Sequence, residues 1–60
     1  MKRFIVKIEG PNLSDIDEVE LPQLPLEGEP IETRYGTCVI VETKSLDEGP
    51  YAGQIVCRLP

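Results

Sequence analysis

The clearest pattern in the chain is an alternation of apolar and polar residues near its start. Phe4, Val6 and Ile8 alternate with other positions over residues 3–9, and a period of two is typical of a half-buried β-strand. Gly10-Pro11-Asn12 follows, and this turn chemistry ends a strand. The sequence therefore predicts a first strand over residues 3–9.

The next segment, residues 13–21, fits two structures. Ser14 could cap one short helical turn near residues 14–17, whereas Val19 and Leu21 fit the inward positions of a strand. We expect a short turn and then a strand from about residue 17 to 21. Pro22 and Pro25 lack amide donors, so the residues around them should form an extended connector.

The second half of the chain predicts three more strands separated by turns. Ile31 and Thr33 face inward on the first of them, and a tight reversal at Tyr35-Gly36 leads into the second. Residues 38–41 are apolar on both faces and β-branched at three of four positions, which predicts a central strand covered on both sides. The final strand should span residues 51–59.

A hairpin formed by residues 37–44 and 51–59 would bring the two cysteines together. The register that we expect pairs Lys44 with Tyr51, Ile40 with Ile55, and Cys38 with Cys57. Cysteine is among the most frequently buried residue types, so the structural interpretation is a pair of buried core thiols. The functional alternative is a redox pair, because directly opposed strand cysteines often form reducible bridges.

Five short strands in 60 residues, with glycine and proline turns and no long amphipathic helix, predict one all-β domain over residues 1–60. The order of a first strand, a long irregular loop and three tightly connected strands, with Leu24-Pro25-x-x-Gly28-x-x-Ile31, resembles the SH3-like small barrels. That resemblance implies a small five-stranded antiparallel barrel or strongly bent sheet, and no known activity. Phe4, Tyr35 and Tyr51 are the only aromatic residues, so the aromatic-rich groove of peptide-binding SH3 domains is missing.

The acidic charge of the chain limits the classes of molecule that it can bind. The net charge is −5, and eight acidic residues with no Lys or Arg lie between Glu9 and Glu32. An acidic face repels phosphate backbones and anionic lipid, so nucleic acid and membranes are disfavoured partners. The remaining basis for nucleic-acid binding is the cluster of Lys2, Arg3 and Lys7 with Phe4.

No apolar run is long enough to span a membrane, and the start of the chain does not look like a signal peptide. We therefore expect a cytoplasmic location, where two cysteines are normally reduced thiols.

The other candidate sites have ordinary structural explanations. The acidic run of Asp15, Asp17, Glu18 and Glu20 lacks the glycine and distal glutamate of a calcium loop. Pro22 to Pro25 has the spacing of an SH3 ligand without its basic anchor. With no histidine in the chain, zinc lacks its usual ligand set and catalysis lacks its commonest base.

We therefore expect a non-enzymatic interaction or regulatory module without a cofactor. It would present an acidic face and at least one exposed strand edge to a protein partner or to a second copy of itself. Arg34, Tyr35, Tyr51 and Arg58 are the residue types that anchor interfaces. The alternative is a redox-responsive regulator that uses Cys38 and Cys57.

Overall fold

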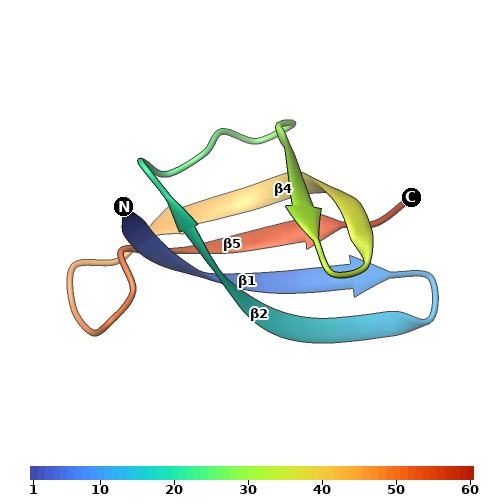
Figure 1. Cartoon of the computed structure of the whole chain (residues 1–60), viewed down its shortest axis with the longest axis horizontal. Helices are drawn as coiled ribbons and strands as arrows, with labels where there is room; N and C mark the ends of the chain where they lie inside the picture. Colours follow the sequence, from blue (N-terminus) through green and yellow to red (C-terminus); the bar gives the residue numbers. More distant parts are fainter.

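A computed structural model describes all residues, 1–60, as one curled sheet of five strands that forms half of a barrel and has no helix (Figure 1). The strands are β1 (Lys2–Gly10), β2 (Leu13–Leu21), β3 (Pro30–Thr33), β4 (Gly36–Ser45) and β5 (Gly53–Arg58). Their order across the sheet is β2-β1-β5-β4-β3. The all-β fold class predicted from the sequence is confirmed.

The sheet is mixed, so the prediction of a purely antiparallel arrangement is wrong. β1 and β5 run parallel, whereas the other three neighbouring pairs are antiparallel, and the arrows of β1 and β5 point the same way in Figure 1. Parallel neighbours need a long crossover connection. Here the connection contains β2, a proline-rich segment over residues 22–29 that we call the linker, and the β3–β4 hairpin.

β2 is longer than the sequence predicts. Residues 14–17 form no helical turn, because each of them pairs with a residue of β1, from Ser14 opposite Glu9 to Asp17 opposite Val6. The backbone hydrogen bonds available along β1 outweigh the local capping tendency of Ser14. β1 and β2 thus make one long hairpin around Pro11 and Asn12.

The pairing of β4 with β5 differs from the predicted register. Ile40 lies opposite Cys57, Thr43 opposite Ile55 and Lys44 opposite Gln54. The hairpin closes at Ser45 and Gly53 instead of Lys44 and Tyr51, so the loop is longer than expected and β5 begins two residues later. Cys38 and Cys57 are therefore diagonal neighbours and not directly opposed.

An irregularity in β4 between Ile40 and Glu42 keeps the correct side chains on the inside. The register changes by one residue there, which is the mark of a β-bulge. Without that extra residue, the first half of β4 would be turned over and Cys38 and Ile40 would face solvent. Val41 is the bulged residue, and it and Glu42 are both exposed.

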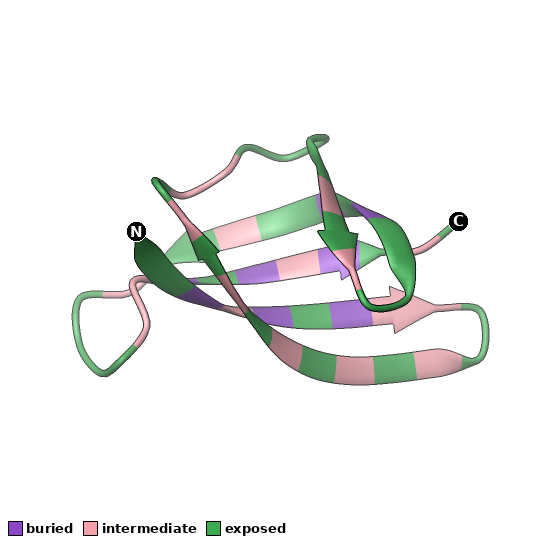
Figure 2. Ribbon diagram, in the orientation of Figure 1, coloured by how far each residue is buried: buried purple, intermediate pink, exposed green.

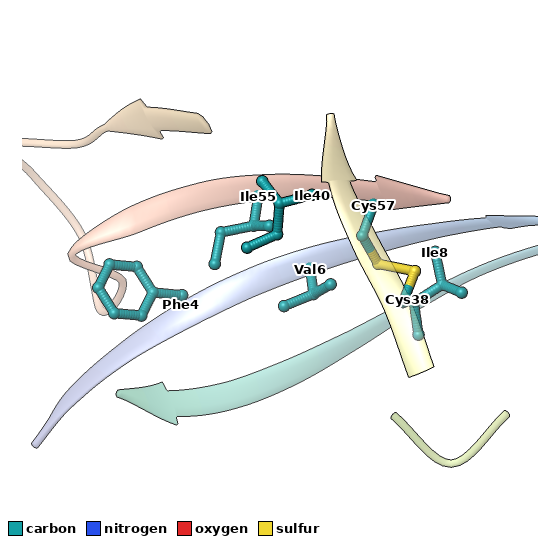
Figure 3. Close-up of a cluster of buried hydrophobic side chains, with 7 residues drawn as sticks. All are labelled: Phe4, Val6, Ile8, Cys38, Ile40, Ile55 and Cys57. Atoms are coloured by element: carbon teal, nitrogen blue, oxygen red, sulfur yellow. A yellow bond between two sulfur atoms is a disulfide. The ribbon is translucent and has the colours of Figure 1, made fainter. Parts of the chain in front are cut away.

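The core lies on one face of the sheet, which we call the inner face. Its seven buried side chains come from β1, β4 and β5 (Figures 2 and 3). They are Phe4, Val6, Ile8, Cys38, Ile40, Ile55 and Cys57. Val39 and Val41 lie on the opposite side and are each 42% exposed, so the prediction that residues 38–41 are covered on both sides is wrong.

Close packing at one end of the core explains the glycine that begins β5. A Cβ atom on Gly53 would lie 2.9 Å from the carbonyl oxygen of Lys44 and 3.0 Å from the Phe4 ring. The backbone atom cannot yield as a flexible side chain could. Only glycine fits where β5 passes between β1, β4 and the linker residue Leu24.

We predict that Gly53→Ala lowers the free energy of unfolding by about 1–3 kcal/mol, the usual cost of overpacking a well-packed site. Gly10→Ala is the matched control, because its Cβ would meet mainly the flexible side chain of Leu59 at 3.3 Å. Urea denaturation measures both. Equal effects of the two substitutions would show that the site at Gly53 is less constrained than its geometry indicates.

Candidate interaction surface

The two cysteines form a disulfide bond inside the core. Cys38 on β4 and Cys57 on β5 are bonded, with their Cα atoms 5.6 Å apart, and both residues are fully buried. Figure 3 shows the bond at the end of the core near Ile8, away from Phe4. The structure thus brings the predicted pair together, but as a disulfide and not as the reduced thiols expected from the sequence.

The turn between β3 and β4 closes the half-barrel with side chains. The guanidinium of Arg34 lies 3.2 Å from a carboxylate oxygen of Asp17, and the hydroxyl of Tyr35 donates to Asp15. Asp15 and Asp17 belong to β2, at the other edge of the sheet. We call these four residues the clasp, because they join two edge strands that share no backbone pairing.

The clasp also rests on an ordered turn. Thr33 donates its hydroxyl to the carbonyl of Gly36 at 2.8 Å and accepts the amide of Tyr35 at 3.1 Å. Gly36 has a φ of 112°, which side chains rarely tolerate. The turn therefore presents Arg34 and Tyr35 to β2. These two residues, predicted as partner contacts, are engaged within the molecule.

The clasp changes the protonation of its members. The hydrogen bond from Tyr35 lowers the pKa of the Asp15 carboxyl, and the amide of Ile16 lowers it further. The same bond raises the pKa of the Tyr35 phenol. The hydrogen bond and the charge of Asp17 raise the pKa of Arg34. Each shift favours the protonation state that holds the two edges together.

Parts of both edges of the sheet are protected against another strand. On β2, the amides of Ile16 and Glu18 donate to the side chains of Asp15 and Asp17, each at 2.8 Å. β3 has only four residues and begins with Pro30, which has no amide proton. Short edges, prolines and side-chain blocking are common means of preventing edge-to-edge pairing. These features protect β2 and β3, whereas residues 42–45 of β4 lie beyond the end of β3 and have no partner strand on that side.

The acidic run of β2 divides between the two faces of the strand. Asp15 and Asp17 belong to the clasp, whereas Glu18 accepts a hydrogen bond from the Tyr51 hydroxyl, and Glu18 and Glu20 each lie 3.9 Å from Arg3. The bond with Glu18 raises the pKa of Tyr51. The four carboxylates do not converge on one point, and Tyr51 is also engaged within the chain.

The face of the sheet opposite the core, which we call the outer face, is uncovered. No second sheet packs on it, because the main contacts between strands are all between neighbours within the sheet. Apolar side chains from β2, β1, β5 and β4 lie on it, as the register and the burial pattern show. They are Ile16, Ile5, Val56, Val39 and Val41, of which Ile16 is the most exposed, at 62%.

Arg58 is the one predicted contact residue that stays available. It lies on the outer face beside Glu9 and Val39 in the register, and it makes no ion pair. The basic cluster proposed for nucleic acid does not form a binding site of the expected kind. Phe4 is buried in the core, so its ring cannot stack on a base.

The main depression in the surface is lined mostly by apolar side chains. An open groove of about 610 Å³ lies beside the linker, lined mostly by leucine and proline side chains between Leu21 and Ile31. Glu29 is its only titratable lining residue. Acid–base chemistry usually requires a donor and an acceptor within hydrogen-bond reach, and the groove contains a single carboxylate.

Comparisons with known proteins give no relative: no protein-family model matches the chain, and no curated protein or solved structure is significantly similar to it. None of the elements is a helix of the length and hydrophobicity needed to cross a membrane.

The outer face is visible in the sequence as apolar residues at the positions of each strand that do not face the core. Ile5, Val39 and Val56 occupy the positions that alternate with core residues, where polar side chains are usual. Ile16 lies in the segment for which the sequence predicts a turn. Apolar residues out of phase with a core are the signal that would have indicated a second, uncovered surface.

We predict that the disulfide stabilises the fold and is inert under native conditions. A bond that closes a loop with a sequence separation of 19 should contribute about 3 kcal/mol to the free energy of unfolding. Denaturation curves measure this contribution. They compare wild type without reductant, wild type with reductant, and the double variant Cys38→Ala/Cys57→Ala. Because both sulfurs are buried, reduction in native buffer should be no faster than unfolding. Fast reduction without loss of stability would support the redox alternative instead.

We predict that Tyr35→Phe destabilises the protein and that the loss depends on pH. Asp15 has a lowered pKa in the folded state. The contribution of its carboxylate to the free energy of unfolding is therefore present above about pH 4 and is lost as the pH falls. Tyr35 has a raised pKa in the folded state. The contribution of its phenol to the free energy of unfolding is therefore present below about pH 10 and is lost as the pH rises. The difference in unfolding free energy between wild type and Tyr35→Phe should therefore be largest between these limits.

Asp15→Asn is the matched control for this experiment. Its side chain can still accept the bond from Tyr35 but does not titrate, so the acidic part of the difference should disappear. A difference that is constant from pH 3 to pH 11 would show that the hydrogen bond between Tyr35 and Asp15 is not the source of the stability loss.

Proposed function

We propose that this protein is a non-enzymatic interaction module that binds another protein through the outer face of its sheet. One observation supports the proposal above all others. Five apolar side chains from four neighbouring strands lie on the face away from the core, and three of them, Ile16, Val39 and Val41, are more than 40% exposed. Exposed apolar patches on small soluble domains commonly mark protein-binding sites.

The surroundings of the patch support the same conclusion. Arg58 lies at its margin and is free of ion pairs, and arginine is enriched in interfaces. Charged residues alternate with the apolar ones, and Lys7 lies between Ile16 and Val56 in the register. The other contact candidates, Arg34, Tyr35 and Tyr51, hold the fold together and are left out of the proposed surface.

The relationship to SH3-like small barrels remains part of the proposal. Five strands and a strongly curled sheet support it, whereas the parallel β1–β5 pair departs from the antiparallel arrangement that the resemblance implies. The proposed activity does not depend on this relationship, because function belongs to the site and not to the fold.

The proposal predicts that Val41→Lys abolishes partner binding without unfolding the protein. Val41 is 42% exposed at the bulge, so the substitution removes apolar contact and adds a charge at little cost to the core. Leu26→Lys is the matched control, because Leu26 is more exposed, at 71%, but lies in the linker. Quantitative pull-down from the native host with tagged wild type and both variants measures binding.

We expect wild type and Leu26→Lys to retain the same partner and Val41→Lys to lose it. Ile16→Lys, on another strand of the outer face, should behave as Val41→Lys does. Denaturation midpoints establish that each variant is folded. Identical partner sets for all four proteins would contradict the proposed surface.

A further inference from the structure

The groove beside the linker is a preformed apolar surface. Leu21, Leu24 and Ile31 line it, and all three are half-buried and pack against the core. Its lining also includes three prolines, whose rings fix the backbone angle φ of the residues that carry them. They are Pro22, Pro25 and Pro30. Its volume of about 610 Å³ lies within the range of about 300–1,000 Å³ that is usual for binding pockets.

A tight turn at the end of the linker holds one carboxylate at this groove. The amide of Glu29 donates to the carbonyl of Leu26 at 3.2 Å, and Gly28 between them has a φ of 90°, as the third residue of a type II turn does. The turn is tied to β4, because the amide of Gly28 donates to the carbonyl of Ile40 at 2.7 Å and the carbonyl of Glu29 accepts the amide of Ile40 at 2.9 Å.

The side chain of Glu29 is fixed by the same turn. One oxygen of its carboxylate accepts the amide of Leu26 at 3.1 Å. The carboxylate takes part in no ion pair, and its second oxygen has no hydrogen-bond partner in the chain. A positioned negative charge therefore lies beside an apolar surface, without a positive charge of the chain to balance it.

The charge of the surrounding chain has the same sign. No Lys or Arg lies between Glu9 and Glu32, a segment that contains the whole linker. Arg34, the next basic residue along the chain, is bound to Asp17. The net charge of −5 attracts cationic partners at long range and repels anionic ones. The groove is thus complementary to a ligand that is apolar and positively charged.

We propose that the groove binds an extended segment of a partner protein that carries a lysine or arginine beside apolar side chains. The apolar side chains occupy the surface formed by leucine, isoleucine and proline, and the basic side chain pairs with the free oxygen of Glu29. The inference goes beyond the proposed function, because none of the groove residues belongs to the outer face. The partner that Val41→Lys loses is therefore not the partner of the groove.

The shape and the backbone of the linker favour an extended peptide as the occupant. The groove is open along the linker, which passes from the end of β2 to the start of β3 (Figure 1). The amides of Gln23 and Leu24 make no hydrogen bond within the chain. The carbonyl groups of an extended peptide accept such amides, as they do when a peptide adds to a strand edge.

The test uses a synthetic peptide whose groove-facing side is defined by its sequence. Its odd positions are lysine, leucine, leucine and lysine, and serines separate them, with both ends blocked. In an extended conformation alternate side chains lie on one side, so the leucines and both lysines face the same way. A lysine at each end allows either chain direction to bring a positive charge to Glu29.

Nuclear magnetic resonance titration of the oxidised, isotope-labelled chain measures binding of this peptide. We expect saturable shifts in the methyl signals of Leu21, Leu24 and Ile31, with a Kd roughly between 10 µM and 1 mM, as for a small transient contact. Two matched peptides test the stated chemistry. Replacing both lysines by glutamate, or both leucines by serine, should abolish the shifts.

Glu29→Gln tests the ion pair. Its side-chain oxygen still accepts the amide of Leu26, so the turn is retained and only the charge is lost. Binding of the basic peptide should weaken about two- to fivefold, the usual worth of one exposed ion pair. Glu27→Gln is the matched control, because it makes the same charge change in the same turn and Glu27 does not line the groove.

A charge at Gln23 tests the groove from its other side. Gln23 is exposed and lines the groove, so neither substitution disturbs the core. Gln23→Glu should strengthen binding of the basic peptide, and Gln23→Lys should weaken it. These opposite effects distinguish a contact in the groove from a change in stability, which denaturation midpoints measure separately.

Three results would overturn the inference. They are a basic peptide that causes no saturable shift up to about 5 mM, well above the expected Kd; an acidic peptide that binds as tightly; and equal effects of Glu29→Gln and Glu27→Gln, which indicate unspecific attraction to an acidic chain. If the peptide fails to bind while Val41→Lys still loses a host partner, the proposed function stands and only the groove is excluded as a binding site.

Discussion

The bulge at Val41 is the constraint on which the rest of the structure depends. The two halves of β4 pair with β5 in registers that differ by one residue, and the bulge is what allows Thr43 and Ile40 both to lie toward the core side. Because successive side chains of a strand alternate between faces, a regular β4 would have turned Cys38 away from Cys57. The disulfide, the compact core and the exposure of Val41 all follow from this one extra residue.

The fold supplements a small core with two kinds of cross-link. Only eight of 60 residues are buried, as expected for a chain of this length. The disulfide fixes β4 to β5 at one end of the core, and the clasp joins β2 to the β3–β4 turn across the open side of the half-barrel. Side-chain bonds thus replace the backbone pairing that closes a full barrel.

The clasp and the side-chain hydrogen bonds of β2 also restrict how another strand could add to that edge of the sheet. Asp15 and Asp17 each accept a backbone amide of β2 and a side chain from the facing turn. This double use occupies the edge that an added strand would need. The acidic residues of β2 therefore form most of their contacts within the molecule.

The sequence by itself determined the all-β class, the first strand and the close approach of the two cysteines. These features depend on local alternation and on turn residues, which act over a few positions. It did not determine the direction of β5 against β1, because a parallel pair depends on where a long crossover returns. It also missed the bulge, since a one-residue offset leaves no mark in the hydrophobic pattern except two exposed valines.

The candidate surface was decided by tertiary structure for the same reason. Ile5, Ile16, Val39, Val41 and Val56 are separated along the chain, and only the sheet order places them side by side. Arg34 and Tyr35 looked like contact residues until the curl of the sheet brought them to Asp17 and Asp15. Local sequence specifies which residues share a face of one strand, whereas the curl and order of the whole sheet specify which faces meet and which stay open.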